Sequence, residues 1–170
     1  MARIFLGLGS NVGDRLQYLQ QALRLLNAAP ALQLVTCSSV YETEPVGKKD
    51  QPVFLNAVAE FLSDAPPQEL LQTAKEIEQQ LGRTETGRWG PREIDIDLLY
   101  YGDVVVKDDD LCLPHPEAAN RRFVMIPLKE IAADFVDPLH KRTIDELLRC
   151  CPDTSAVRRS SKLIHQQMEK

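Results

Sequence analysis

The sequence predicts an α+β fold. Its ferredoxin-like βαββαβ core would have helices packed on an antiparallel sheet, with a C-terminal hairpin and further helices after it. Two observations predict this. Short apolar segments of strand length alternate with longer segments whose leucines recur at helical spacing. A polar loop, rather than a helix, separates the second and third predicted strands, which gives the split βαβ order. The 170 residues suit a single domain over 1–170, with a loosely packed tail over 155–170.

The first strand is predicted over residues 4–9, and a Gly-Ser-Asn turn follows it. Asn11 and Asp14 are both candidates for the cap of the next helix. Leucines at helical spacing predict that helix: Leu16, Leu19, Leu23 and Leu26. The glycines before it do not form a dinucleotide-binding fingerprint, because their G-x-G-x-x-x-G spacing is one residue too long.

The second strand is predicted over residues 32–42 and the third over 53–61. Alternation along the third strand places Phe54, Asn56 and Val58 on one face and Leu55, Ala57 and Ala59 on the other. An aromatic ring beside an amide suits a flat heterocyclic ligand, and equally suits a core Phe beside a hydrogen-bonded Asn. The second helix opens at residues 64–70 with prolines in its first turn and ends at Gly82, with Glu78 expected at the margin of its apolar face.

The fourth strand, residues 92–101, carries the chemistry of the chain. Its alternation turns Ile94, Ile96 and Leu98 inward and puts Asp95 and Asp97 together on the other face, roughly 6.6 Å apart along the strand. Carboxylates this close repel each other unless a cation such as Mg²⁺ lies between them, so the pair predicts a site for two metal ions. An isolated Asp-x-Asp is more often a solvated strand edge. The nearby arginines favour the metal interpretation. A guanidinium group can bind two oxygens of one phosphate, and a phosphate ligand would accompany Mg²⁺.

The remaining elements are predicted in order. A hairpin turns at Gly102-Asp103. His115 lies between two prolines, which suits a positioned ligand contact and equally a local turn. Residues 124–133 are predicted as a strand that becomes a short helix at Pro127, and residues 143–148 as a capped helix.

Composition narrows the function classes. A net charge of −5 argues against a general nucleic-acid surface, and no aromatic pattern of an RNA-binding sheet is present. The chain has neither a signal-peptide pattern nor the ~20 apolar residues that cross a membrane. The cysteines lack C-x-x-C spacing, so we expect them to be reduced. We therefore expect a cytoplasmic monomer with no nucleic-acid or membrane partner.

The segment R-W-G-P-R-E-I-D-I-D-L-L, residues 88–99, resembles the signature of the 6-hydroxymethyl-7,8-dihydropterin pyrophosphokinases of folate biosynthesis. The resemblance continues in residues 9–11, 114–116 and 120–123, and covers about residues 2–136. It implies an ATP- and Mg²⁺-dependent diphosphotransferase. Such an enzyme transfers pyrophosphate from ATP to the hydroxymethyl group of the pterin, leaves AMP, and uses two Mg²⁺ ions.

The same resemblance implies the site residues. The catalytic set would be Arg83, Arg92, Asp95 and Asp97, and the last two would also hold the metal ions. ATP would be bound by Arg83, Arg88, Trp89, Arg92, Ile96, Leu98, Leu111, His115 and Arg121. The pterin would be bound by Gly9, Thr43, Pro45, Val46, Phe54, Asn56, Trp89, Asp95 and Phe123, with the rings of Phe54 and Phe123 on opposite sides of it.

The chain departs from the family pattern in three places. Residues 84–87 lack an arginine that relatives often have, Asp110 stands where some relatives have Arg, and Lys75 stands where Gln or Glu is frequent near the adenine. Two other functions remain compatible with the residues alone. One is a binding module on a ferredoxin-like sheet; the other is γ-phosphate or nucleotidyl transfer, which would use the same metal pair.

Overall fold

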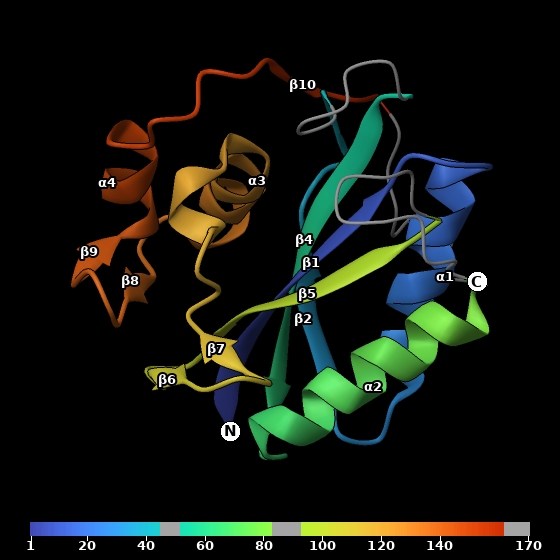
Figure 1. Cartoon of the computed structure of the whole chain (residues 1–170), viewed down its shortest axis with the longest axis horizontal. Helices are drawn as coiled ribbons and strands as arrows, with labels where there is room; N and C mark the ends of the chain where they lie inside the picture. Colours follow the sequence, from blue (N-terminus) through green and yellow to red (C-terminus); the bar gives the residue numbers. More distant parts are fainter. Residues whose placement is uncertain (45–51, 83–92, 162–170) are drawn as a thin grey trace.

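The computed structural model describes residues 1–44, 52–82 and 93–161. Within these ranges the main sheet has six strands in the order β10-β3-β4-β1-β5, with β2 also paired to β4. All of these pairings are antiparallel, which confirms the predicted α+β, ferredoxin-like class (Figure 1). The strands are β1 Ala2–Ser10, β2 Gln33–Cys37, β3 Tyr41–Thr43, β4 Phe54–Ser63, β5 Asp95–Tyr101 and β10 Val157–Arg159.

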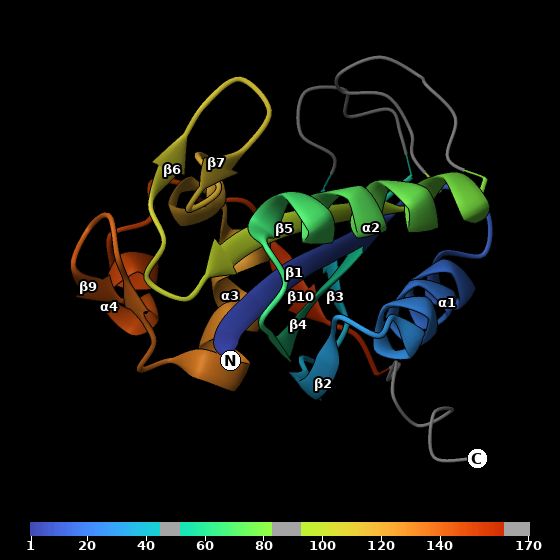
Figure 2. The ribbon, with the colours of Figure 1, turned by 90° about the horizontal axis from the view of Figure 1, so that it is seen from below.

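Helices α1 (Arg15–Ala28) and α2 (Pro67–Gln80) pack on one face of the sheet (Figure 2). The Asp14 side chain accepts a hydrogen bond from Gln17 N at 3.2 Å, so Asp14 is the cap of α1. The predicted prolines open α2, and Gly82, with φ +87°, follows its end. The apolar faces of these helices and the inward residues of β1, β4 and β5 form one core cluster, in which Leu6, Leu55 and Leu98 are buried.

The other face of the sheet is covered by α3 (Arg122–Ala132), with α4 (Ile144–Arg149) beside it (Figure 1). The two helices of the βαββαβ core thus share one face, and the C-terminal helices cover the opposite one. A second core cluster joins Val124, Met125 and Leu128 of α3 to Phe5 and Val58 of the sheet. The reason is visible in β1, where adjacent residues are apolar and buried on both faces of the strand.

Two local predictions are corrected. Residues 122–132 form a continuous helix, not a strand followed by a helix, because α3 packs an apolar side onto the sheet despite Pro127 within it. The predicted second strand is two strands, β2 and β3, separated at Ser38–Val40. Ser38 keeps this break bonded to β4, since its N–H donates to Val58 O at 2.8 Å and its hydroxyl accepts from Val58 N at 2.9 Å.

Small elements complete the fold. Gly102 and Asp103 do form a turn, but the predicted pairing across it is wrong. Within the described residues the hairpin after β5 joins β6 (Val106–Lys107) to β7 (Cys112–Leu113) and turns later, at residues 108–111. A second hairpin joins β8 (Val136–Asp137) to β9 (Arg142–Thr143). A 3₁₀ turn, Ala118–Asn120, precedes α3. Thr143 caps α4 through Glu146 N at 3.2 Å, as predicted. In the part of the chain that the structure describes, no helix is both long and apolar enough to span a membrane.

The last described segment differs from its prediction. Residues Val157–Arg159, expected within a loosely packed tail, form β10 and pair with β3 at the edge of the main sheet (Figure 1). The pattern of this segment is polar, so its pairing is a backbone interaction that side-chain periodicity does not report.

Candidate active site

The site is a trench in the sheet above β1, and two glycines form its floor. Gly9 pairs with Asn56 on β4 and with Asp95 on β5, while Gly7 pairs with Val58 and Asp97. Residues two apart share a face of a strand, and glycine has no side chain, so the central strand leaves a hollow between its two neighbours. A Cβ atom on Gly9 would lie 2.7 Å from Asn56 Oδ1, so any other residue there would displace the Asn56 amide.

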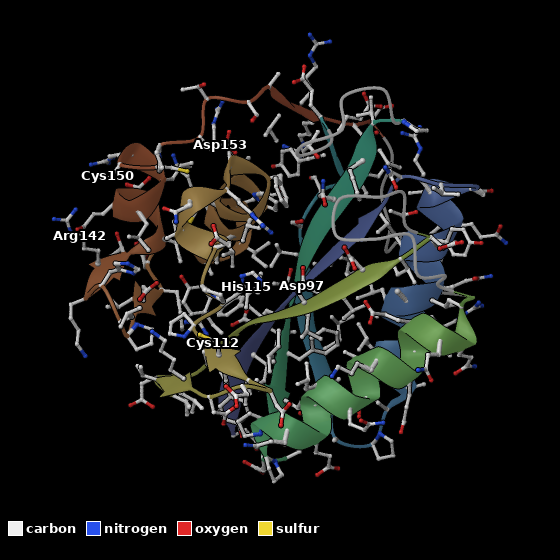
Figure 3. The ribbon with its side chains drawn as sticks, in the orientation of Figure 1. Asp97, Cys112, His115, Arg142, Cys150 and Asp153 are labelled. Carbon is white, nitrogen blue, oxygen red and sulfur yellow. The ribbon has the colours of Figure 1, made fainter. Side chains whose placement is uncertain are left out.

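This trench opens into a cavity of about 250 Å³ between the sheet and the start of α3. Residues predicted from the sequence line it: Gly9, Thr43, Phe54, Asn56, Asp95, Asp97, His115, Arg121 and Phe123. Figure 3 shows the side chains of Asp97 and His115 close together near the middle of the molecule. Sequence reasoning missed other lining residues: Gly7, Leu8, Glu44, Ala57, Val58, Leu99 and Val124. Only Gly7 had a usable signal, because two glycines at strand period mark a face without side chains.

The remaining predicted residues lie elsewhere. Six of them fall outside the described residues: Pro45, Val46, Arg83, Arg88, Trp89 and Arg92. Ile96, Leu98 and Leu111 are 4%, 5% and 5% exposed and belong to the core cluster under α1 and α2. Ile96 and Leu98 thus face away from the aspartate pair, as the alternation predicts. Whether these three residues contact ATP stays a prediction.

The two aspartates lie on β5, which is an edge strand of the main sheet among the described residues. Ile96, which lies between them, donates its N–H to Glu78 Oε2 at 2.9 Å. Glu78 is buried, and the expectation that it lies at the margin of the apolar face of α2 is wrong. A carboxylate from α2 therefore satisfies a backbone donor in the middle of the aspartate pair and ties the strand to the helix.

A β-bulge in β5 lies next to the aspartates. Phe5 pairs with Tyr100 and Leu6 with Leu98, which leaves Leu99 as the extra residue. Leu99 and Tyr100 both belong to the cluster on the α3 side of the sheet, and Leu99 also lines the cavity. Leu99 O accepts the N–H of His115 at 2.9 Å, so the bulged strand also holds the histidine segment.

The aspartate pair has the donors that Mg²⁺ prefers. Both residues offer carboxylate oxygens, and the lining of the cavity contains no thiol. No cluster of three or more His, Cys, Asp or Glu that could hold a metal occurs in the described ranges. Mg²⁺ needs no such cluster, because it is commonly bound by one or two carboxylates together with water and substrate phosphates. The residues present therefore fit magnesium.

His115 enters the cavity as a neutral hydrogen-bond donor. Its Nδ1 accepts the N–H of Glu117 at 3.1 Å, so the neutral ring carries its proton on Nε2. Burial lowers the pKa of His115 below its ordinary 6.5, and the nearby positive charge of Arg121 lowers it further, although Glu117 opposes this. At neutral pH the ring therefore offers a donor without adding charge.

An amide and two aromatic rings form the remaining walls. Asn56 is buried and donates from Nδ2 to Thr43 Oγ1 at 2.5 Å, which fixes the orientation of its amide. Phe54 lies two residues before Asn56 and therefore on the same face of β4. At the start of α3, the Arg121 guanidinium lies 5.6 Å from the centre of the Phe123 ring, within the range of a cation–π contact. The cavity thus combines flat apolar surfaces with a fixed amide and with groups that attract phosphate.

Comparison with known proteins identifies relatives that match most of this chain. A family model described as 7,8-dihydro-6-hydroxymethylpterin-pyrophosphokinase matches residues 5–133. Three relatives carry the name 2-amino-4-hydroxy-6-hydroxymethyldihydropteridine pyrophosphokinase. The Bacillus subtilis protein is 45% identical over 75% of this chain and 76% of its own. The Aquifex aeolicus protein is 42% identical over 86% and 90%, and the Haemophilus influenzae protein is 37% identical over 93% and 98%.

Solved structures agree in fold. A chain described as HPPK-DHPS in complex with substrates superposes with a TM-score of 0.69 at 14% identity, over 88% of this chain and 43% of that one. The wild-type Plasmodium falciparum HPPK-DHPS gives a TM-score of 0.67 at 16% identity, over 88% and 44%. This chain therefore spans less than half of those solved chains, and at these identities the likeness concerns the fold alone.

Proposed function

This chain belongs to the 7,8-dihydro-6-hydroxymethylpterin-pyrophosphokinase family, and from that premise we propose how its cavity performs the reaction. The enzyme transfers pyrophosphate from ATP to the hydroxymethyl group of 6-hydroxymethyl-7,8-dihydropterin, giving AMP and the pterin diphosphate, a step of folate biosynthesis. The pterin hydroxyl gives up its proton to solvent as its oxygen forms a bond to the β-phosphorus, the bond from that phosphorus to the oxygen bridging to the α-phosphate breaks, and AMP leaves. One observation carries this proposal. A single cavity combines a carboxylate pair, a fixed amide between strands, aromatic surfaces and phosphate-binding groups.

The pterin lies against the β4 side of the trench. Asn56 uses one amide hydrogen on Thr43 and so presents its carbonyl oxygen and its other hydrogen to the edge of the ring. Phe54 and Phe123, from β4 and α3, contact the two faces of the ring. Gly9 leaves room for the heterocycle between them, because its missing side chain is what hollows the floor.

The triphosphate lies on the β5 side. Asp95 and Asp97 would hold two Mg²⁺ ions there, together with the phosphates of ATP. When bound, these ions withdraw negative charge from the transferred group. His115 donates from Nε2 to a phosphate oxygen and Arg121 supplies a positive charge. Arg83, Arg88, Trp89 and Arg92 are proposed to complete the ATP site from outside the described residues, and Arg83 and Arg92 to act in catalysis.

Attack by the alcohol requires alignment more than covalent chemistry. The cavity holds the pterin on one side of the Gly7–Gly9 floor and the triphosphate on the other, so that the hydroxymethyl group meets the β-phosphorus over β1. We further propose that residues 1–170 act as one domain, as a cytoplasmic monomer without a nucleic-acid or membrane partner.

The deciding experiment incubates the protein with ATP, Mg²⁺ and the hydroxymethyl dihydropterin and resolves the nucleotide products by ion-exchange chromatography. AMP that forms only when the pterin is present is the expected result. ADP would show ordinary γ-phosphate transfer and overturn the β-phosphorus assignment. Binding of ATP without any turnover would indicate a binding module. Repeating the assay with EDTA tests the metal, and we expect turnover to stop.

A further inference from the structure

A segment beyond the family match contacts two walls of the cavity. The family model ends at residue 133, whereas residues 151–160, which we call the C-terminal strap, run from the end of α4 past the start of α3 to the edge of the sheet (Figure 1). No residue of the strap lines the cavity. Its two points of attachment, however, are each adjacent to lining residues.

The first attachment is at the N-terminus of α3. The residue before this helix, Arg121, makes no capping hydrogen bond with its own side chain. Asp153 takes that place, because its Oδ2 accepts the N–H of Arg122 at 3.0 Å, and Figure 3 shows Asp153 near the start of α3. Arg122 returns the contact, donating from Nη1 to Ser155 O at 2.8 Å.

The Asp153 carboxylate is itself held in position. Its Oδ1 accepts the Ser155 N–H at 2.8 Å and also the Ser155 hydroxyl. Partial burial tends to raise the pKa of Asp153, but hydrogen bonds from Ser155 and Arg122 and the charge of Arg122 lower it below its ordinary value. The group is therefore ionised at neutral pH, and its negative charge lies at the positive end of the α3 dipole.

The second attachment is at β3. Strand β10 pairs with β3 in the register Val157 to Thr43, and Ser160 N donates to Val40 O at 2.8 Å. Thr43 lines the cavity and accepts the amide hydrogen of Asn56, so the strap supports the strand that orients this amide.

We propose that the C-terminal strap positions the α3 and β3 walls of the cavity, and that Asp153 is the residue through which it fixes Arg121 and Phe123. Both of these residues line the cavity, and Arg122, whose N–H Asp153 holds, lies between them. A displacement of the first turn of α3 would therefore move the cation and the ring together. The inference rests on the proposed function, since it assigns Phe123 and Asn56 to the pterin.

The test compares Asp153→Ala and Asp153→Asn with a matched control, Asp145→Ala. Asp145 is a carboxylate that contacts the same helix farther along, through Lys129 at 3.2 Å, and it also pairs with Arg149. We expect Asp153→Ala to raise the KM for the pterin about fivefold at saturating ATP, the size of a lost helix cap. Asp153→Asn, which retains an acceptor for Arg122 N, should restore most of the wild-type KM, and Asp145→Ala should leave it unchanged.

A second readout does not require activity. Hydrogen exchange of the amides in residues 122–125 of the free protein should become at least fivefold faster in Asp153→Ala and stay unchanged in Asp145→Ala, because only the first change releases the start of α3. If Asp153→Ala does not fold, Ser155→Ala replaces it, with about a twofold increase expected in both measurements.

The outcomes separate two failures. A wild-type protein that forms no AMP with the pterin contradicts the proposed function, and the exchange measurement then decides whether the strap holds α3. Wild-type activity with an unchanged pterin KM in Asp153→Ala, or with an equal increase in Asp145→Ala, would overturn the positioning role of the strap.

Discussion

The two faces of the main sheet are made by alternate residues of the same strands, yet their contents are opposite. Toward α1 and α2, β1 presents Leu6 and Leu8 and β5 presents Ile96, all within a closed apolar core. Toward the cavity, the neighbouring positions of β1 are Gly7 and Gly9. The first face stabilises the fold by burying apolar surface, whereas the glycines of the second face leave room for the proposed ligand.

The cavity face is itself divided. At one end Phe5 and Tyr100 pack edge to face, with ring centres 6.3 Å apart, and Phe135 and α3 close over them. At the other end the glycines, Asn56 and the aspartates line the cavity together with the start of α3. Adjacent residues of one strand therefore serve different ends, since one packs in the core and the next lines the cavity. Substitutions on opposite faces should accordingly affect different measurements.

The largest effect is expected from Asp97→Ala. Removing one carboxylate of the proposed metal pair should lower kcat about a thousandfold or more, because several kcal/mol of charge stabilisation would depend on the proposed ions. The melting temperature should stay the same or rise, since a repulsive pair is relieved. AMP production and a thermal melt measure both effects. Asp103→Ala, in the exposed turn after β5, is the control, and equal rates in the two variants would contradict the metal site.

On the opposite face, Leu6→Ala should give the reverse result. Leu6 is 1% exposed in the core under α1 and α2, and its truncation should lower the free energy of unfolding by about 2–5 kcal/mol. Urea denaturation measures this loss. Both KM values should remain at wild-type level below the unfolding transition. Leu139→Ala, at a residue 57% exposed, should change stability by less than about 0.5 kcal/mol. A raised pterin KM in Leu6→Ala would show that the faces are not separable.

A smaller effect is expected from Gly9→Ala on the floor of the trench. The new Cβ atom would lie 2.7 Å from Asn56 Oδ1, so the amide must move and the pterin KM should rise roughly tenfold. Gly7→Ala is the matched variant, because its Cβ atom would meet the flexible end of Leu99 at 3.4 Å. We expect less than about a threefold change there. Steady-state kinetics at saturating ATP distinguishes the two, and equal effects would refute a specific role for Gly9.

The smallest effect concerns alkaline pH and the junction of β3 with α3. Burial, and a hydrogen bond to Glu130 at 2.6 Å, raise the pKa of Tyr41 from 10.0 to about 12. Between these values the unfolded chain has lost a proton that the folded protein keeps, so the free energy of unfolding should fall as the pH rises from about 10 to about 12. Urea titrations at several pH values measure the slope.

Tyr41→Phe should reduce that slope without removing it. Burial also raises the pKa values of Tyr100 and Cys37, and their contributions have the same sign. A slope equal to that of the wild type would show that the Tyr41 to Glu130 contact does not persist in solution.

Much of the site could be predicted from short patterns. The alternation in β5 separates the aspartates from Ile96 and Leu98, and the same reasoning places Asn56 and Phe54 on one face of β4. Family resemblance added Arg121 and the roles of His115 and Gly9. The errors lie where tertiary contacts override a local pattern. Residues 124–126 form helix because they pack on the sheet, and Glu78 is buried because it satisfies the N–H of Ile96.

The sequence by itself determined which residues share a side of each element, because that depends only on the period of a strand or helix. It therefore determined the carboxylate pair, the core residues of β5 and the fold class. Only the tertiary structure decided which distant elements meet. Asp153 caps a helix that begins 31 residues earlier, and β10 pairs with β3. Such contacts follow from the register and packing of whole elements, and no local period encodes them.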